Sequence, residues 1–185
     1  MSNQEYKGVF IFIQQVEGKI AGVSYELIGK GKELANALDT VVTAVLMGYQ
    51  VGSLTKKLAD YGADRVILVD DPALEIYTTE PYVKAWTMVV ETYKPEIVLY
   101  GATAIGRDLA PRVSARVHTG LTADCTKLAI QEGSGNLMMT RPAFGGNIMA
   151  DILCPAHRPH MATIRPGACA FTQLTPPTAA ALWFL

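Results

Sequence analysis

Short apolar runs alternate with segments of helical spacing along the first 120 residues, and this alternation constrains the fold more than any other feature. The apolar runs cover residues 9–16, 40–48, 65–70 and 97–101. The helical segments cover residues 24–39, 51–62, 79–94 and 105–120. Continuous apolar runs are typical of strands buried on both faces, and successive strand–helix units join parallel strands through right-handed crossovers. The sequence therefore predicts an α/β domain with a mainly parallel, doubly wound sheet and helices on both faces.

Particular residues mark the expected helix ends. We expect Ser24 to cap the first helix and Thr79 the third, because an N-cap hydroxyl accepts a hydrogen bond from a free backbone N–H group. Gly62 suits the position after the second helix, and Gly120 has the same place after the fourth. Pro95 is predicted to end the third helix.

The pattern changes after residue 120. Residues 125–131 and 137–141 are short strand-like runs around the sequence EGSGN, whose composition is typical of a hairpin turn. The segments NIMADILC and MATIR supply two further runs. We therefore expect a small antiparallel extension of the sheet after residue 120. Residues 1–167 are predicted to form the domain, and residues 168–185 an uncharged tail.

Charge and composition exclude several kinds of partner. Sixteen Lys and Arg residues stand against seventeen Asp and Glu residues, without a long run of either sign, so we expect no nucleic-acid partner. No apolar segment is long enough for membrane insertion, and the N-terminus lacks an export leader. Three cysteines without a CxxC pair fit the reducing cytoplasm. An apolar share of 50% favours a surface covered by another protein and is compatible with a homodimer of the isolated chain.

Motifs that would identify an enzyme are absent from the sequence. There is no GxxxxGK[ST], GxGxxG, GxSxG or HExxH pattern. Cys154, His157 and His160 in CPAHRPH have a spacing that permits a metal site with sulfur and nitrogen ligands. The two prolines of this segment favour a plain turn instead, and we expect no metal.

The segment GATAIGRDLAPR joins the fourth apolar run to the fourth helix. It is expected at the carboxyl edge of the sheet, where open α/β folds bind ligands and where helix N–H groups can hold an anion. In the alternative interpretation, Gly101 and Gly106 permit close packing, and Asp108 pairs with Arg112 one turn later. We favour the packing interpretation for this segment.

The segment TRPAFGGN lies in the expected antiparallel extension. A guanidinium beside a Gly-Gly pair indicates a backbone that approaches something flat or anionic. The candidate contact residues are Arg141, Phe144, Gly145 and Gly146. In the alternative, Arg141 forms a salt bridge with Asp124 or Asp151.

These segments also carry a family resemblance. The run GATAIGRDLAPRVSARVHTGLTADCTKL, followed by LMMTRPAFGGNIMADILCPAHRPHMATIRPG, resembles the N-terminal domain of an electron transfer flavoprotein α subunit. The opening FIFIQQVEGKIAGVSYELIGKGKELANAL is similar too, so the resemblance extends over residues 6–167.

The resemblance implies a doubly wound domain that pairs with an electron transfer flavoprotein β subunit. In that family the heterodimer is an electron carrier between flavin dehydrogenases and an acceptor, and is not an enzyme. FAD is bound by a C-terminal domain of the α subunit, and the β subunit holds AMP or a second FAD near the interface. We expect a shortened form in which residues 168–185 stand in place of the linker and FAD domain, with no cofactor bound by this chain alone. By the same resemblance, Arg141 and its neighbours reach a flavin held by the partner.

Two other classes of function stay open at the level of sequence. A nucleotide-binding sensor of the universal-stress type shares the general fold and would bind AMP or ATP near Gly101, although a glycine-rich phosphate loop is missing. A purely structural assembly module would explain the apolar composition and the tail that ends in LWFL.

Overall fold

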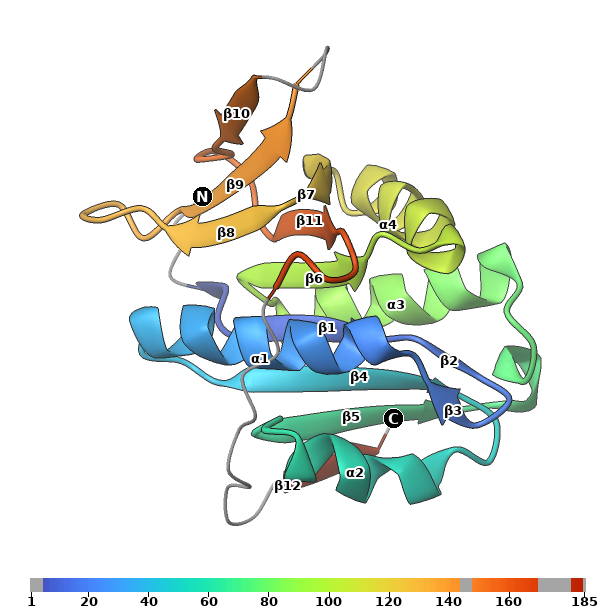
Figure 1. The fold of residues 1–185 in the computed structure, drawn as a ribbon. Helices are drawn as coiled ribbons and strands as arrows, with labels where there is room; N and C mark the ends of the chain where they lie inside the picture. The colour runs from blue at the N-terminus through green and yellow to red at the C-terminus, as the bar shows by residue number, and fades with distance from the viewer. Residues whose placement is uncertain (1–4, 144–147, 170–180, 185) are drawn as a thin grey trace.

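A seven-stranded parallel sheet forms the centre of the fold (Figure 1). The structure is a computed structural model that describes residues 5–143, 148–169 and 181–184. The strands are ordered β12-β5-β4-β1-β6-β11-β7, and each neighbouring pair is parallel. They are β1 (Val9–Ile13), β4 (Val42–Gly48), β5 (Arg65–Asp70), β6 (Ile97–Gly101), β7 (Leu121–Cys125), β11 (His160–Ile164) and β12 (Ala181–Phe184). The predicted fold class is confirmed.

Within the described residues, four α-helices cover the two faces of the sheet. They are α1 (Gly22–Ala37), α2 (Thr55–Asp60), α3 (Thr79–Tyr93) and α4 (Ala104–Arg116), with short 3₁₀ helices at Gly52–Leu54 and Pro72–Leu74. The first two helices pack on one face, and α3 and α4 pack on the other (Figure 1). Strand β1 shows why its sequence is apolar throughout. Val9, Ile11 and Ile13 belong to the core under α1, whereas Phe10 and Phe12 belong to the core under α3 and α4.

The antiparallel extension is also confirmed. Strands β8 (Lys127–Ile130), β9 (Leu137–Pro142) and β10 (Met149–Ile152) form a sheet of order β10-β9-β8, which stands at the β7 end of the main sheet (Figure 1). Gly133 and Gly135, in the turn between β8 and β9, have positive φ angles that only a residue without Cβ adopts easily. A second, two-stranded sheet joins β2 (Gln15–Val16) to β3 (Lys19–Ile20).

The assignment of MATIR to the antiparallel extension is wrong. The first four of these residues belong to β11, which lies in the main sheet between β6 and β7 and is parallel to both, and Arg165 follows directly. All five residues of β11 are buried, and a short apolar run does not reveal which sheet it joins. The expected strand over residues 125–131 is also divided, because Asp124 takes a positive φ near the end of β7 and β8 starts at Lys127.

Two expected helix caps are wrong, and two expected helix ends are confirmed. Ser24 lies inside α1, where its buried Oγ accepts a hydrogen bond from the Gln14 N–H group. Thr79 is the first residue of α3, after the N-cap residue Thr78, and its hydroxyl bonds to α4 instead. Gly62 has the positive φ expected after α2, and α3 ends before Pro95, but after α4 the positive φ belongs to His118 and not to Gly120.

Candidate functional site

Arg141 lies on β9, directly opposite Ala150 of β10. It shares a face of the extension with Met139, because side chains two residues apart on a strand point the same way. Met139 is buried in the core of the domain, so this face looks toward the parallel sheet. The Thr126 N–H group donates to the Thr140 carbonyl oxygen at 2.9 Å, which places this part of β9 beside the end of β7. The half-buried Arg141 therefore stands where the extension meets the carboxyl edge of the sheet.

The charge of Arg141 acts on the last residue of β7. Cys125 is fully buried, and its burial raises the pKa of the thiol to about 11, although the positive charge of Arg141 acts in the opposite direction. A guanidinium stays charged throughout the physiological range. Arg141 therefore supplies a permanent positive charge at this edge.

The two carboxylates that the sequence offered to Arg141 have other partners among the described residues. Asp124 pairs with Arg107 of α4, with 3.0 Å between Oδ1 and Nη2. Asp151 accepts a hydrogen bond from the Thr140 hydroxyl across the β9–β10 pair. The salt-bridge interpretation of Arg141 is therefore wrong for Asp124 and Asp151. The other predicted contact residues, Phe144, Gly145 and Gly146, lie outside the described residues.

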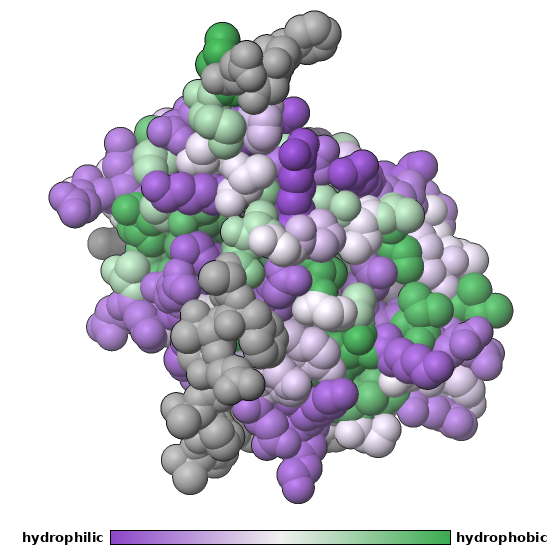
Figure 2. Space-filling model, in the orientation of Figure 1, coloured by the Kyte–Doolittle hydropathy of each residue, from purple (hydrophilic) through white to green (hydrophobic). Residues whose placement is uncertain are grey.

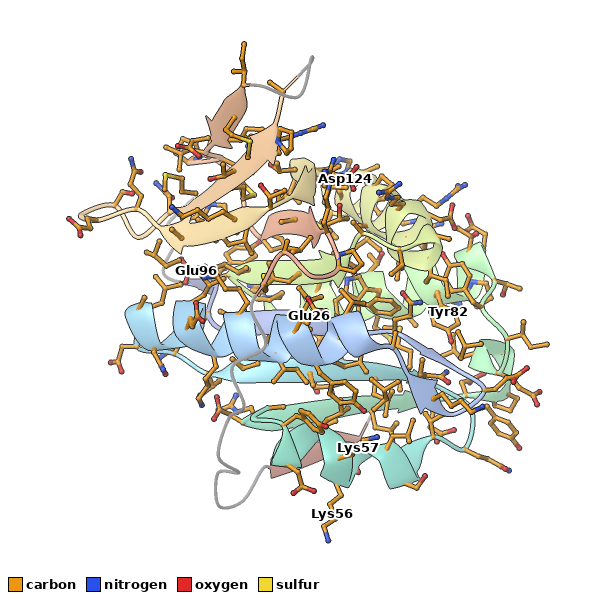
Figure 3. All side chains as sticks on the ribbon, in the orientation of Figure 1. Glu26, Lys56, Lys57, Tyr82, Glu96 and Asp124 are labelled. Carbon is orange, nitrogen blue, oxygen red and sulfur yellow. The ribbon has the colours of Figure 1, made fainter. Side chains whose placement is uncertain are left out.

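Arginines from three elements gather around the end of β7. Arg107 comes from the first turns of α4, and its partner Asp124 lies where β7 meets that helix (Figure 3). Exposed Arg165 follows β11, and its backbone N–H group donates to the Cys125 carbonyl oxygen at 3.0 Å. Together with Arg141 they form what we call the arginine edge. The sequence analysis did not identify Arg107 and Arg165 as candidate site residues. Arg165 directly follows β11, and Arg107 lies in the first turn of α4, which follows β6. Ligands bind at such positions in this fold class.

The topological switch point between β1 and β6 is closed by side chains of this chain. Strand order reverses there, and open α/β folds bind ligands at that crevice. The Thr103 hydroxyl donates a hydrogen bond to Gln14 Oε1 across the gap. A Cβ added to Gly101 would lie 2.7 Å from Cγ1 of Val23, which shows how closely α1 packs on the end of β6. This closure disfavours a nucleotide-sensor function at the described part of this edge.

The packing interpretation of GATAIGRDLAPR is confirmed. A Cβ on Gly106 would lie 1.9 Å from the Gly101 carbonyl oxygen, so α4 touches the end of β6 there. The Gly106 N–H group donates to the Thr103 side chain, which caps the helix. Asp108 pairs with Arg112 at 3.0 Å as expected.

The CPAHRPH segment does not form a metal site in the structure. No group of His, Cys, Asp and Glu side chains within the described ranges is arranged to hold a metal ion. His160 is fully buried at the start of β11, and both ring nitrogens contact backbone groups, the Leu137 N–H group and the Cys154 carbonyl oxygen. Burial, together with the charge of Arg158, lowers the pKa of His160 to about 4, so the imidazole is neutral at pH 7.

The fold and the arginine edge define a doubly wound α/β domain with an added antiparallel sheet, and arginines from both parts gather at the end of β7. The electron transfer flavoprotein domain family matches residues 9–181. An electron transfer flavoprotein subunit alpha from Thermoanaerobacterium thermosaccharolyticum is 53% identical over 163 residues, which cover 88% of this chain and 49% of that protein. The corresponding subunit from Clostridium acetobutylicum is 50% identical over 167 residues, with coverages of 90% and 50%. The acryloyl-CoA reductase electron transfer subunit beta of Anaerotignum propionicum is 44% identical over 184 residues, with coverages of 88% and 50%.

This chain belongs to the electron transfer flavoprotein family. It spans about half the length of these curated relatives. None of the helices in the described part has the length and apolar character needed to cross a bilayer. Cys125, Cys154 and Cys169 are free thiols.

Proposed function

We propose that this chain acts as the N-terminal domain of an electron transfer flavoprotein α subunit and docks on a β subunit through the extension formed by β8, β9 and β10. The heterodimer carries electrons between flavin dehydrogenases and an acceptor. Its flavin is FAD, and the β subunit holds AMP or a second FAD. FAD supplies the capacity to take up and release electrons, and this chain supplies the interface and part of the flavin's electrostatic environment.

Within this interface, Arg141 approaches a flavin held by the partner. The observation that carries the proposal is a half-buried arginine that forms no ion pair with a carboxylate in the described residues, near the end of β9. A fixed positive charge stabilises negative charge that develops on a ring system nearby, and it needs no reorganisation to do so. Phe144, Gly145 and Gly146, which follow in sequence, complete the proposed contact.

Exposed apolar side chains next to Arg141 support a docking role for the extension. Ile148 is 65% exposed and Met149, opposite Pro142, is 52% exposed. Apolar surface of this kind favours coverage by a partner protein. Figure 2 shows apolar residues among polar ones on the projecting end of the molecule that holds the extension. The closed switch point further favours a cofactor held by the partner rather than by this domain.

Three further features belong to the proposal. Residues 1–167 contain the surface that docks on the β subunit. The free thiols agree with a cytoplasmic location. In the absence of a β subunit, the same bare face permits a homodimer.

The test mixes the purified chain with a β subunit that carries FAD and follows the visible flavin spectrum and the reduction potential. The chain alone is expected to be colourless, and its addition is expected to shift both properties of the partner's flavin. Arg141→Ala should abolish most of the shift, and Arg141→Lys should retain part of it because the charge remains.

Arg116→Ala is the matched control for this test. Arg116 is an exposed arginine in the last turn of α4, where it pairs with Glu80 of α3. Its replacement should leave the flavin shift intact. An unchanged spectrum and potential with Arg141→Ala would contradict the proposed contact, and FAD bound stoichiometrically by the chain alone would contradict a partner-held flavin.

A further inference from the structure

The His160 imidazole forms hydrogen bonds to the chain at the start of β9 and just after β10. The Leu137 N–H group, at the start of β9, donates to His160 Nδ1 at 3.3 Å. Because Nδ1 accepts, Nε2 carries the proton and donates to the Cys154 carbonyl oxygen at 3.0 Å, just beyond β10. The His160 N–H group in turn donates to the Glu96 carbonyl oxygen at 2.8 Å. An inner strand of the main sheet is therefore bonded to both legs of the hairpin that carries Arg141.

A buried guanidinium beside His160 repeats this arrangement. The Arg158 side chain is 5% exposed, and its Nη2 donates to Asn136 Oδ1 at 2.9 Å, one residue before β9. Nη1 donates to the His157 carbonyl oxygen at 3.1 Å, on the segment that follows β10. Nε has no hydrogen-bond partner among the described residues, and the facing carboxylate oxygen of Glu96 is 3.9 Å away. Burying a charged group with an unsatisfied N–H group lowers the stability of the fold. We therefore interpret Arg158 as a residue that fixes the positions of the two segments to which it bonds.

The hydrogen bonds of His160 also distinguish it from a residue that only fills space. A leucine would fill a similar volume in the core, but it could bond to neither Leu137 nor Cys154. The charged group that acts on the imidazole is Arg158, on the preceding turn, and Arg158 in turn faces the carboxylate of Glu96, the residue before β6. Both lie at the base of the hairpin.

We propose that Arg158 and His160 form a clamp that positions the β9–β10 hairpin, and through it Arg141, against the partner's flavin. This inference rests on the proposed function and assigns positioning residues to it. Arg141 lies four residues beyond Leu137 along β9, or about 13 Å at strand spacing. The clamp therefore acts at the base of the hairpin, and neither of its residues touches the flavin.

Hydrogen exchange on the isolated full chain tests the clamp without the partner. In His160→Leu the Leu137 amide loses its acceptor, so it and the amides of β9 and β10 should exchange about tenfold faster than in the wild type, relative to the core of β1 and β4. His160→Gln should restore much of the protection, because its amide can both accept and donate. If His160→Leu fails to fold, Arg158→Lys, which loses the forked contacts to Asn136 and His157, gives the same comparison.

Val113→Ala separates the clamp from general destabilisation. Val113 is a fully buried residue of α4 on the opposite face, and its truncation should lower global stability without selective exchange in the hairpin. Each variant is then added to the FAD-loaded β subunit. His160→Leu should lose most of the flavin shift even when the β subunit is saturating, and His160→Gln should recover it.

The outcomes for the clamp and for the proposed function differ. The clamp is overturned if the hairpin of His160→Leu exchanges at the wild-type rate, or at the rate seen in Val113→Ala, or if its flavin shift equals that of the wild type. A wild-type chain that leaves the flavin unchanged overturns the proposed function instead. The clamp, which acts through Arg141 on that flavin, falls with it, and the exchange data then report only whether the hairpin is anchored.

Discussion

The Tyr77 hydroxyl donates a 2.7 Å hydrogen bond to Asp108 Oδ2 and thereby joins the segment before α3 to the first turns of α4. Thr79 donates to the same oxygen at 2.7 Å, and Arg112 Nε donates to Oδ1 at 3.0 Å. The hydrogen bonds from Thr79 and Tyr77 lower the pKa of the Asp108 carboxyl below its ordinary value. The Asp108 carboxylate therefore links α3 to α4, the two helices that cover the face of the sheet that bears Phe10 and Phe12.

Replacing Asp108 with Ala is expected to lower the free energy of unfolding by about 1–2 kcal/mol, because two hydroxyl donors lose a charged acceptor. Since the folded pKa is depressed, the contribution of Asp108 is present above the unfolded pKa and is lost as the pH falls through the folded pKa. Urea unfolding at pH 7 and at pH 3 measures both effects. Glu91→Gln, an exposed change on α3, serves as the control and should be close to neutral. Equal losses for Asp108→Ala at both pH values would contradict this account.

His160 should make the domain sensitive to mild acid. Its folded pKa is lowered to about 4 from an ordinary value of 6.5, so the folded chain resists a proton that the unfolded chain accepts. The stabilising effect is complete above the unfolded pKa and declines as the pH falls from 6.5 toward 4, by up to about 3 kcal/mol. Denaturant unfolding across this window, compared with His160→Gln, isolates the contribution. A decline of equal size in both proteins would assign it to other groups.

Two glycines in helices should respond in opposite ways to a single methyl group. Gly106→Ala brings Cβ to 1.9 Å from the Gly101 carbonyl oxygen, so α4 must move off the end of β6, and we expect a loss of about 3 kcal/mol or more. Gly29→Ala in α1 meets no atom of the described residues within 4 Å and should stabilise by about 0.5–1 kcal/mol. Thermal unfolding of the two variants beside the wild type measures both changes. A Gly106→Ala variant as stable as the wild type would contradict the close contact between α4 and β6.

The order of elements could be predicted from sequence because each signal was local. The residues of β1 are apolar throughout since they belong to two cores, and the glycines of EGSGN mark the turn between β8 and β9. The place of β11 could not be predicted in the same way. Its five buried residues fit either sheet, and only pairing with β6 and β7 decides between them.

The candidate site could be predicted in part. The place of Arg141 in the antiparallel extension could be predicted from the strand-like pattern around it. The partner of Asp124 could not be predicted, because Arg107 comes from a separate helix 17 residues earlier. The roles of Arg158 and His160 depend on where β9 lies against β11, since Leu137 and His160 are 23 positions apart in the sequence. Contacts of this range are set by tertiary packing, and no local pattern of residues reports them.

The closed switch point has a consequence for binding thermodynamics. A nucleotide entering between β1 and β6 would first have to break the Gln14–Thr103 hydrogen bond and displace the Val23 side chain, so the free energy of that rearrangement would be subtracted from its affinity. The crevice that binds ligands in related sheets is here filled by packed side chains. In our proposal this packed edge supports the arginine edge, and the partner's flavin approaches the arginine edge from outside the domain.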